Sequence, residues 1–252
     1  MKRTLLVIIT VGLLCFFIVR NNNDPAAIVS ALAKNGPVKE GNLVYRIYAF
    51  GILPVGYARI NKETDETYNG SRAYHLSASA ESANYLSAFV RATAQIDSYI
   101  DPQTHNPLAF KQEVSISNKK SVRKEITYDQ QTGTMTMAGV KRQIMPDTQD
   151  ALSAIYNIRA ADFGKTKSLR MLLNTNQKNY LMEGKAATGE IKAAGKTFKL
   201  SFASLEIKRH DGNPYHRSKL SIAMLKDYGN IPVLIKIFAS GAMINAKLVK
   251  IE

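Results

Sequence analysis

From residue 41 onward, the chain alternates apolar and polar positions with the period of two that is typical of strands with one buried face. Residues 91–100 give the clearest case, because the even-numbered positions carry Ala, Ala, Ile, Ser and Ile while the odd-numbered positions carry Arg, Thr, Gln, Asp and Tyr. The pattern predicts strands throughout residues 43–251. Besides residues 91–100, the expected strands cover residues 43–48, 57–60, 108–117, 121–128, 134–138, 169–173, 179–188, 197–207, 219–224, 233–238 and 242–251.

Turn residues separate these runs. Asn69-Gly70 supplies the positive φ angles that a tight hairpin requires, and Asp211-Gly212 and Ser240-Gly241 mark two further turns. Within residues 197–207 the apolar positions change parity, which predicts a β-bulge near Ala203.

Two internal segments have a helical pattern. Residues 150–160 place apolar side chains three and four positions apart, and Asp147 or Thr148 would cap the start of a helix that packs on the sheet. Residues 82–90 form a weaker helical pattern, for which an apolar loop is the alternative. A dozen strands and one or two short helices predict an all-β fold with minor α content, as a large curved antiparallel sheet or half-barrel.

An N-terminal membrane segment is expected before this domain. Lys2 and Arg3 precede an uncharged run over residues 4–19, which indicates either a signal peptide or a signal anchor within residues 1–20. Ala31 and Ala33 lie too far beyond this run to form an ordinary cleavage site, which favours the anchor. The two leading cations place the N-terminus in the cytoplasm and the remainder of the chain outside it.

Residues 21–40 are expected to form a tether, within which residues 26–33 have the alternative of a short helix. Residues 41–252 are then a single β-rich periplasmic domain. The expected location is the bacterial cell envelope, either anchored in the inner membrane or secreted to the periplasm after cleavage.

Charge narrows the set of partners. The formal net charge is +14, which attracts polyanions. In an exported protein the accessible polyanions are anionic lipid, lipopolysaccharide and acidic wall polymers rather than nucleic acid. The alternative is a solvated basic surface without a ligand.

The residues that would carry catalysis or bind a metal are sparse. Cys15, the single cysteine, lies inside the N-terminal apolar run, so an intramolecular disulfide is excluded. No nucleophile motif stands out, and the histidines lack the spacing of a helical metal site. We therefore expect no cofactor, no metal and no catalytic residues. The histidines are His75, His105, His210 and His216.

The order and spacing of four short phrases resemble a bacterial exported family known as domain of unknown function 3108. The resemblance spans residues 41–251 and implies an envelope location and a curved antiparallel β architecture, with no established activity to carry over. By a looser analogy of shape, the fold is similar to the half-barrels of lipoprotein carriers, which hold acyl chains in a concave apolar face. The four phrases are residues 53–58 (LPVGYA), 98–102 (SYIDP), 150–156 (DALSAIY) and 232–235 (PVLI).

The leading functional hypothesis is a noncatalytic envelope protein that binds a lipid or another anionic amphiphile in a concave apolar groove. One alternative is an assembly or scaffold protein that binds another envelope protein, and a second is a hydrolase acting on wall or lipid material. For each candidate groove residue, plain core packing is the competing interpretation. The candidate groove residues are Tyr85, Leu86, Phe89, Ile155 and Tyr156.

Overall fold

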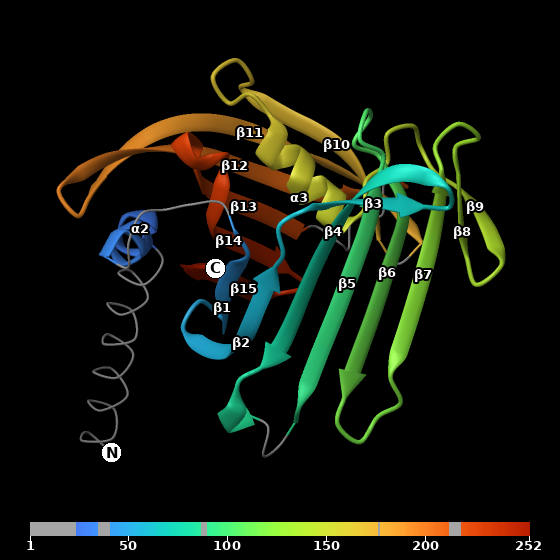
Figure 1. The fold of residues 1–252 in the computed structure, drawn as a ribbon, viewed down its shortest axis with the longest axis horizontal. Coiled ribbons are helices and arrows are strands. Elements are labelled where there is room, and N and C mark those ends of the chain that lie inside the picture. The colour runs from blue at the N-terminus through green and yellow to red at the C-terminus, as the bar shows by residue number, and fades with distance from the viewer. Residues whose placement is uncertain (1–23, 35–40, 87–89, 176, 212–217) are drawn as a thin grey trace, which may run out of the picture.

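A computed structural model of the chain describes residues 24–34, 41–86, 90–175, 177–211 and 218–252. These residues form one antiparallel sheet of fifteen strands that curls around a helix (Figure 1). The strands are β1 (Leu43–Ala49), β2 (Leu53–Ile60), β3 (Thr64–Tyr68), β4 (Ser71–Ser82), β5 (Ala92–Ile100), β6 (Pro107–Ile116), β7 (Val122–Asp129), β8 (Thr134–Met137), β9 (Val140–Gln143), β10 (Ser168–Thr175), β11 (Lys178–Ala193), β12 (Lys196–Arg209), β13 (Ser218–Leu225), β14 (Ile231–Ala239) and β15 (Ala242–Ile251).

The sheet approaches a barrel without a complete closing ladder. Its strand order is β10-β11-β12-β13-β14-β15-β1-β2-β4-β5-β6-β7-β8-β9, and β3 pairs with β4 beside this path. Between the two ends, the backbone of Gln149 forms an isolated parallel bridge: its N–H donates to the oxygen of Leu172 (2.8 Å) and its oxygen accepts from the N–H of Asn174 (2.8 Å). The segment after β9 therefore links the two edges.

This architecture confirms the expected all-β fold with a curved antiparallel sheet and short helices. The hairpin turn between β3 and β4 uses Asn69 and Gly70, with φ angles of 50° and 82°, and the turn between β14 and β15 uses Ser240 and Gly241, with φ angles of 50° and 80°. Gly212, in the third expected turn, lies outside the described residues. So does the expected membrane segment, and no described helix is long and apolar enough to cross a bilayer.

The predicted β-bulge near Ala203 is wrong. Strand β12 pairs with β11 and β13 through this position without a shift of register. Leu200 and Leu205 point to opposite faces of the strand, yet they are 0% and 1% exposed. Apolar residues change parity here because the covered face changes along β12: Lys199 is exposed on the side of Leu205, and Ser204 and Glu206 are exposed on the side of Leu200. The alternating pattern does not distinguish such a change from a bulge.

Helix α3 (Ala151–Ala160) packs on the sheet face that we call the inner face. Asp150, rather than Asp147 or Thr148, is its N-cap. The Asp150 carboxylate accepts hydrogen bonds from the backbone N–H groups of Leu152 (2.8 Å) and Ser153 (3.0 Å), and the Ser153 hydroxyl accepts from the N–H of Asp150 (2.9 Å). This capping box satisfies donors that the first helical turn otherwise leaves unpaired.

The cap is also the point where α3 joins the sheet. The hydroxyl of Ser98, on β5, donates to the Asp150 carboxylate at 2.6 Å, and both residues are almost completely buried. Burial raises the pKa of Asp150 to about 6, although its hydrogen bonds with Ser98 and the helix backbone act in the opposite direction. Leu152 and Tyr156 then pack on the inner face of β4 and β5.

Helix α2 (Pro25–Lys34) precedes the sheet and belongs to its core. Asp24 caps it, since its side chain accepts from the N–H of Ala26 at 2.9 Å. The buried residues Ile28, Val29 and Leu32 pack in the main hydrophobic cluster, and the helix contacts β11, β14 and β15. Residues 25–34, in the expected tether, thus contribute a packed helix. Two short 3₁₀ segments, η1 (Asn84–Leu86) and η2 (Lys226–Tyr228), complete the described elements.

Stability should depend on the protonation of Asp150. The folded state binds this proton more tightly than the unfolded chain, because the pKa rises from 3.8 to about 6. The resulting stabilisation, on the order of 3 kcal/mol, is fully present below about pH 4 and is lost as the pH rises through 6. Asp150→Asn retains an acceptor at the cap but does not titrate. Urea denaturation should therefore show that wild type loses stability relative to this variant as the pH is raised from 4 to 7. A constant difference would contradict this account.

Truncating a buried side chain of α2 should destabilise the whole domain. Leu32→Ala should lower the free energy of unfolding by about 2–5 kcal/mol, because it leaves a cavity against the sheet. The exposed neighbour offers a control, and Ala31→Ser should change stability by no more than about 0.5 kcal/mol. Chemical denaturation of the full chain checks both values. Equal effects of the two substitutions would show that α2 is not part of the cooperative unit.

Candidate functional site

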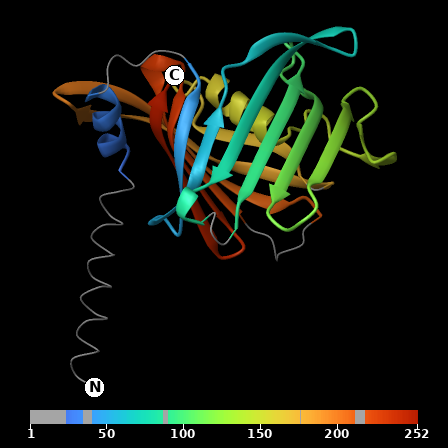
Figure 2. The ribbon, with the colours of Figure 1, turned by 60° about the horizontal axis from the view of Figure 1, so that its bottom comes forward.

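Large apolar side chains are exposed together at one end of six neighbouring strands. The connections between β1 and β2 and between β4 and β5 supply half of them, and the adjoining ends of β2, β14 and β15 supply the others. Figure 2 shows the β1–β2 turn and η1 at the lower side of the molecule. Six strands span roughly 24 Å at the usual strand spacing. We call this surface the apolar rim, and it consists of Phe50, Ile52, Leu53, Tyr85, Val90, Ile237, Phe238 and Ile244.

Backbone hydrogen bonds hold these connections and strand ends side by side. The N–H of Phe50 donates to the oxygen of Met243 at 2.7 Å, which joins the β1–β2 turn to the β14–β15 hairpin. The N–H of Ala83 donates to the oxygen of Val55 at 2.9 Å, and the hydroxyl of Tyr85 donates to the oxygen of Pro54, so η1 is fixed to β2. The rim is therefore built on ordered elements.

Phe50 is presented in an unfavourable backbone conformation. Its φ angle is 52°, in the left-handed region that bulky side chains rarely adopt, and Gly51 follows at 76°. The side chain remains 61% exposed, so burial within the domain does not offset this cost. The same pair of positive φ angles occurs at Ala138-Gly139 and Ala194-Gly195, so this conformation belongs to the tight hairpin, and the distinguishing feature here is the large exposed apolar side chain.

The charges within the connections that form the rim are all positive. Arg91 follows Val90, and its carbonyl oxygen accepts from the N–H of Ser117 at 2.7 Å, which places the turn with Lys119 and Lys120 beside it. The sequence of the rim connections and this turn contains no Asp or Glu. A negatively charged surface that approaches these connections therefore meets cations, and the nearest carboxylate along β4 is that of Glu81, two residues before Ala83. These segments are residues 49–55, 83–91, 117–121 and 237–244.

The structure divides the sequence-predicted groove residues between two places. Tyr85, 52% exposed, and Leu86 lie in η1 and so at the rim. Ile155 and Tyr156 lie on α3, where the ring of Tyr156 is 6.5 Å from that of Tyr74. The α3 contact with Leu76 and the start of η1 are about seven residues apart along β4, or roughly 23 Å. These two groups do not line one groove, and Phe89 lies outside the described residues.

The interior around α3 is filled. Ile158, Met182, Leu205 and Val233 are at most 1% exposed and belong to one continuous cluster. Open hollows of about 680 and 790 Å³ lie on the opposite, outer face of the sheet, lined by both polar and apolar side chains, and another of about 750 Å³ lies beside Asn157 of α3. Most of the large apolar side chains that are exposed in the described part of the chain lie at the rim.

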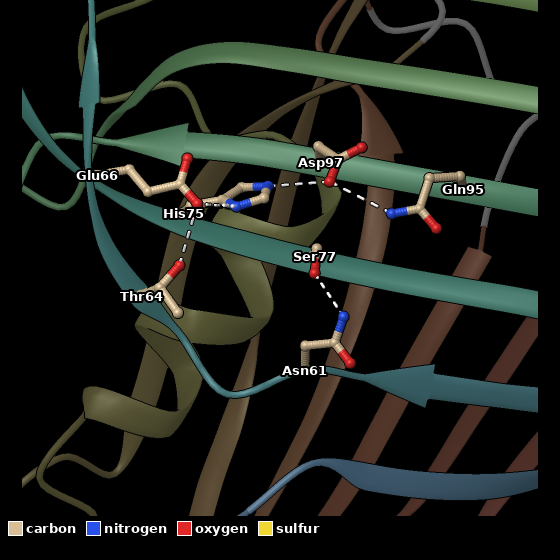
Figure 3. A network of polar contacts seen from close by, with 7 residues as sticks. All are labelled: Asn61, Thr64, Glu66, His75, Ser77, Gln95 and Asp97. Carbon is tan, nitrogen blue, oxygen red and sulfur yellow. Dashed lines mark hydrogen bonds and ion pairs between the residues drawn. The ribbon is translucent and has the colours of Figure 1, made fainter.

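A polar network on the outer face connects β3 to the sheet (Figure 3). His75 lies between two carboxylates, with Nδ1 2.9 Å from Glu66 and Nε2 2.9 Å from Asp97. The nearby hydroxyl of Ser77 accepts from the side chain of Asn61 at 2.7 Å instead of facing the imidazole. Within the described residues, no group of His, Cys, Asp and Glu could hold a metal ion. We therefore assign this network to attachment of β3.

Comparison with known proteins agrees with the architecture. The family model described as a protein of unknown function (DUF3108) matches residues 44–248. The chain belongs to the DUF3108 family. No curated protein matches it.

A solved structure has a similar fold. It is the crystal structure of a beta-barrel-like protein of domain of unknown function DUF1849 from Brucella abortus, with a TM-score of 0.55 and 11% sequence identity. The similarity covers 85% of the DUF3108 chain and 98% of the other. At this identity the likeness shows the fold alone.

Sequence reasoning missed most of the rim of this DUF3108 protein. Ile237, Phe238 and Ile244 continue runs that are buried elsewhere in β14 and β15, so their exposure has no signal in the alternating pattern. Phe50 and Ile52 did carry a signal, because large apolar residues flank Gly51 where a turn usually has polar ones. Such an inversion at a hairpin turn points to a binding surface.

Proposed function

We propose that this DUF3108 protein is a noncatalytic envelope protein that binds an anionic lipid surface through its apolar rim. The observation that carries the proposal is the exposure of eight large apolar side chains at one end of six adjacent strands. Contiguous apolar surface of this kind marks a site of interaction in a soluble domain. The rim replaces the concave groove of the original hypothesis, since α3 and its neighbours fill the interior.

Apolar burial at the rim is sufficient for appreciable binding. Transfer of a phenylalanine side chain out of water contributes about 1.5–3 kcal/mol. Phe50 and Phe238 are 61% and 46% exposed, and six further side chains surround them. Partial insertion of the set into the interface of a bilayer would thus offset the cost of association.

Charge adds preference for anionic lipid. A lysine or arginine near a negatively charged membrane contributes about 1 kcal/mol, and this contribution decays within a Debye length of about 8–10 Å at ordinary salt. Arg91, Lys119 and Lys120 border the rim, and these segments have no acidic residue. The expected result is binding that weakens, without vanishing, when salt is raised.

The N-terminal sequence supplies a reason for a membrane to be close. Five residues separate Val19, the end of the apolar run, from Pro25, the start of α2. Even fully extended, this spacer reaches only about 20 Å. In Figures 1 and 2, helix α2 lies at the left of the molecule, and its N-terminal end is directed toward the lower side, where the β1–β2 turn and η1 lie. An anchored N-terminus would hold the rim within reach of the same membrane.

Vesicle binding by residues 24–252 tests the proposal, since this segment contains α2 and lacks the apolar run. The segment should co-float with vesicles of phosphatidylglycerol and phosphatidylcholine more than with phosphatidylcholine alone. Phe50→Ser and Phe238→Ser should each weaken partitioning by about tenfold. Val140, which is 51% exposed on β9 and outside the rim, provides the matched control, and Val140→Ser should bind as wild type does.

The pattern of losses decides between alternatives. Equal binding by the rim variants and the control would remove the rim from the interaction. Absence of binding to every vesicle, together with a stoichiometric protein partner lost in Phe238→Ser, would favour the scaffold hypothesis instead.

A further inference from the structure

Three cations lie together on the outer face of β14, β15 and β1. In the strand register, Arg46 is directly opposite Lys247, and Lys236 is opposite Asn245, which in turn is opposite Tyr48. We call Arg46, Lys236 and Lys247 the cation triad. Like charges placed directly opposite one another destabilise a sheet.

The triad has no ion-pair partner in the described part of the chain, unlike other cations of the same sheet. Lys111 pairs with Glu125 at 3.4 Å, and Arg123 pairs with Glu113 at 3.1 Å. Arg46 and Lys247 belong to a row of directly opposed residues that runs across the sheet. Along this row Tyr57 is opposite Arg46, and Glu81, the first carboxylate, is opposite Tyr57. The remaining neighbour with a charge, Arg59, pairs with Glu252 at 2.6 Å. The sheet therefore leaves the triad uncompensated.

Tyrosine rings contact two members of the triad, Arg46 and Lys247, without neutralising them. The Lys247 ammonium lies 4.0 Å from the centroid of the Tyr48 ring, and the Arg46 guanidinium lies 5.9 Å from the rings of both Tyr48 and Tyr57. Lys247 is only 6% exposed, which is rare for a lysine that lacks an acidic partner. Burial, with a smaller effect from Lys236, lowers the pKa of Lys247.

We infer that the cation triad is a binding site for a phosphate group. Two lysine ammoniums and a planar guanidinium offer point charges and a hydrogen-bonding fork, the combination that phosphate oxygens prefer. A bound phosphate would neutralise the opposed charges and restore the pKa of the buried lysine. The site is built at a cost to the empty protein, as expected for residues retained for a ligand.

The position of the triad also indicates where the phosphate comes from. Lys236 precedes Phe238 by two residues on the same face of β14, which places it about 7 Å from the rim along the strand, and Arg46, opposite Lys247, precedes Phe50 by four residues, or about 13 Å. When the rim enters the acyl boundary, the triad is level with the lipid phosphates. This assignment to a lipid headgroup rests on the proposed function, whereas binding of the phosphate group itself does not.

Inorganic phosphate tests the site directly. The full chain in an uncharged detergent should bind inorganic phosphate saturably in calorimetry at constant ionic strength. Lys247→Met retains most of the aliphatic stem over Tyr48 and should weaken binding by about tenfold. Lys199→Met, at an exposed lysine on β12, should leave affinity unchanged. Equal affinities of the two variants would overturn the site and leave only a basic surface.

Thermal unfolding separates a ligand site from a structural lysine. Without phosphate, Lys247→Met should unfold a few degrees above wild type, because it removes a buried charge that has no partner. Saturating phosphate should raise the midpoint of wild type by more than that of the variant. A lower midpoint for Lys247→Met, with no phosphate effect in either protein, would assign Lys247 to the fold and refute the site.

Phosphatidylglycerol vesicles distinguish the two sources of phosphate. Lys247→Met should weaken both vesicle binding and inorganic phosphate binding, whereas Phe238→Ser should weaken only vesicle binding. Loss of inorganic phosphate binding with unchanged vesicle binding would refute the headgroup assignment and leave a site for free phosphate. Failure of wild type to bind vesicles, with phosphate binding intact, would refute the proposed function and not the phosphate site.

Discussion

The burial of one face of a very large sheet around α3 is the constraint on which the other features depend. A sheet of this size must curl to cover its apolar face. Asp150 fixes how it does so, since one carboxylate caps α3 and accepts from Ser98 on β5. Helix α2 fills a second part of the core against β11, β14 and β15. The rim is the place where apolar side chains extend beyond this coverage.

Two independent costs meet at this end of the molecule. The rim exposes apolar area and places Phe50 at a positive φ angle, whereas the triad places like charges opposite each other and buries Lys247. Neither arrangement stabilises the isolated domain. A bilayer with anionic headgroups would compensate both, because acyl chains take up the rim and phosphates neutralise the triad. That one ligand class relieves both costs is the main argument for a membrane-surface role.

Local sequence signals predicted the local structure well. Asn69-Gly70 and Ser240-Gly241 form the expected hairpin turns, and the helical period of residues 150–160 predicted α3, although its cap is three residues beyond Asp147. These features depend on dihedral preference and on side chains a few positions apart. The family resemblance, now shown over residues 44–248, agrees with the same architecture.

Long-range register could not be read in the same way. The triad requires β1 to pair with β15, near the other end of the chain, and only that register sets Arg46 opposite Lys247. Likewise, the alternating pattern does not reveal that the covered face of β12 changes along the strand, so it predicted a bulge at the parity change near Ala203. The separation of Tyr85 from Tyr156 also follows from which ends of β4 meet η1 and α3.

The depth of the rim in a bilayer is the most direct test of this account. A spin label at Phe238→Cys in vesicle-bound protein should be accessible to oxygen and shielded from a water-soluble nickel complex, as expected for a side chain at the acyl boundary. A label at Ser71→Cys, at the far end of β4 from η1, should show the reverse. Aqueous accessibility at both positions while the protein remains bound to vesicles would contradict insertion of the rim.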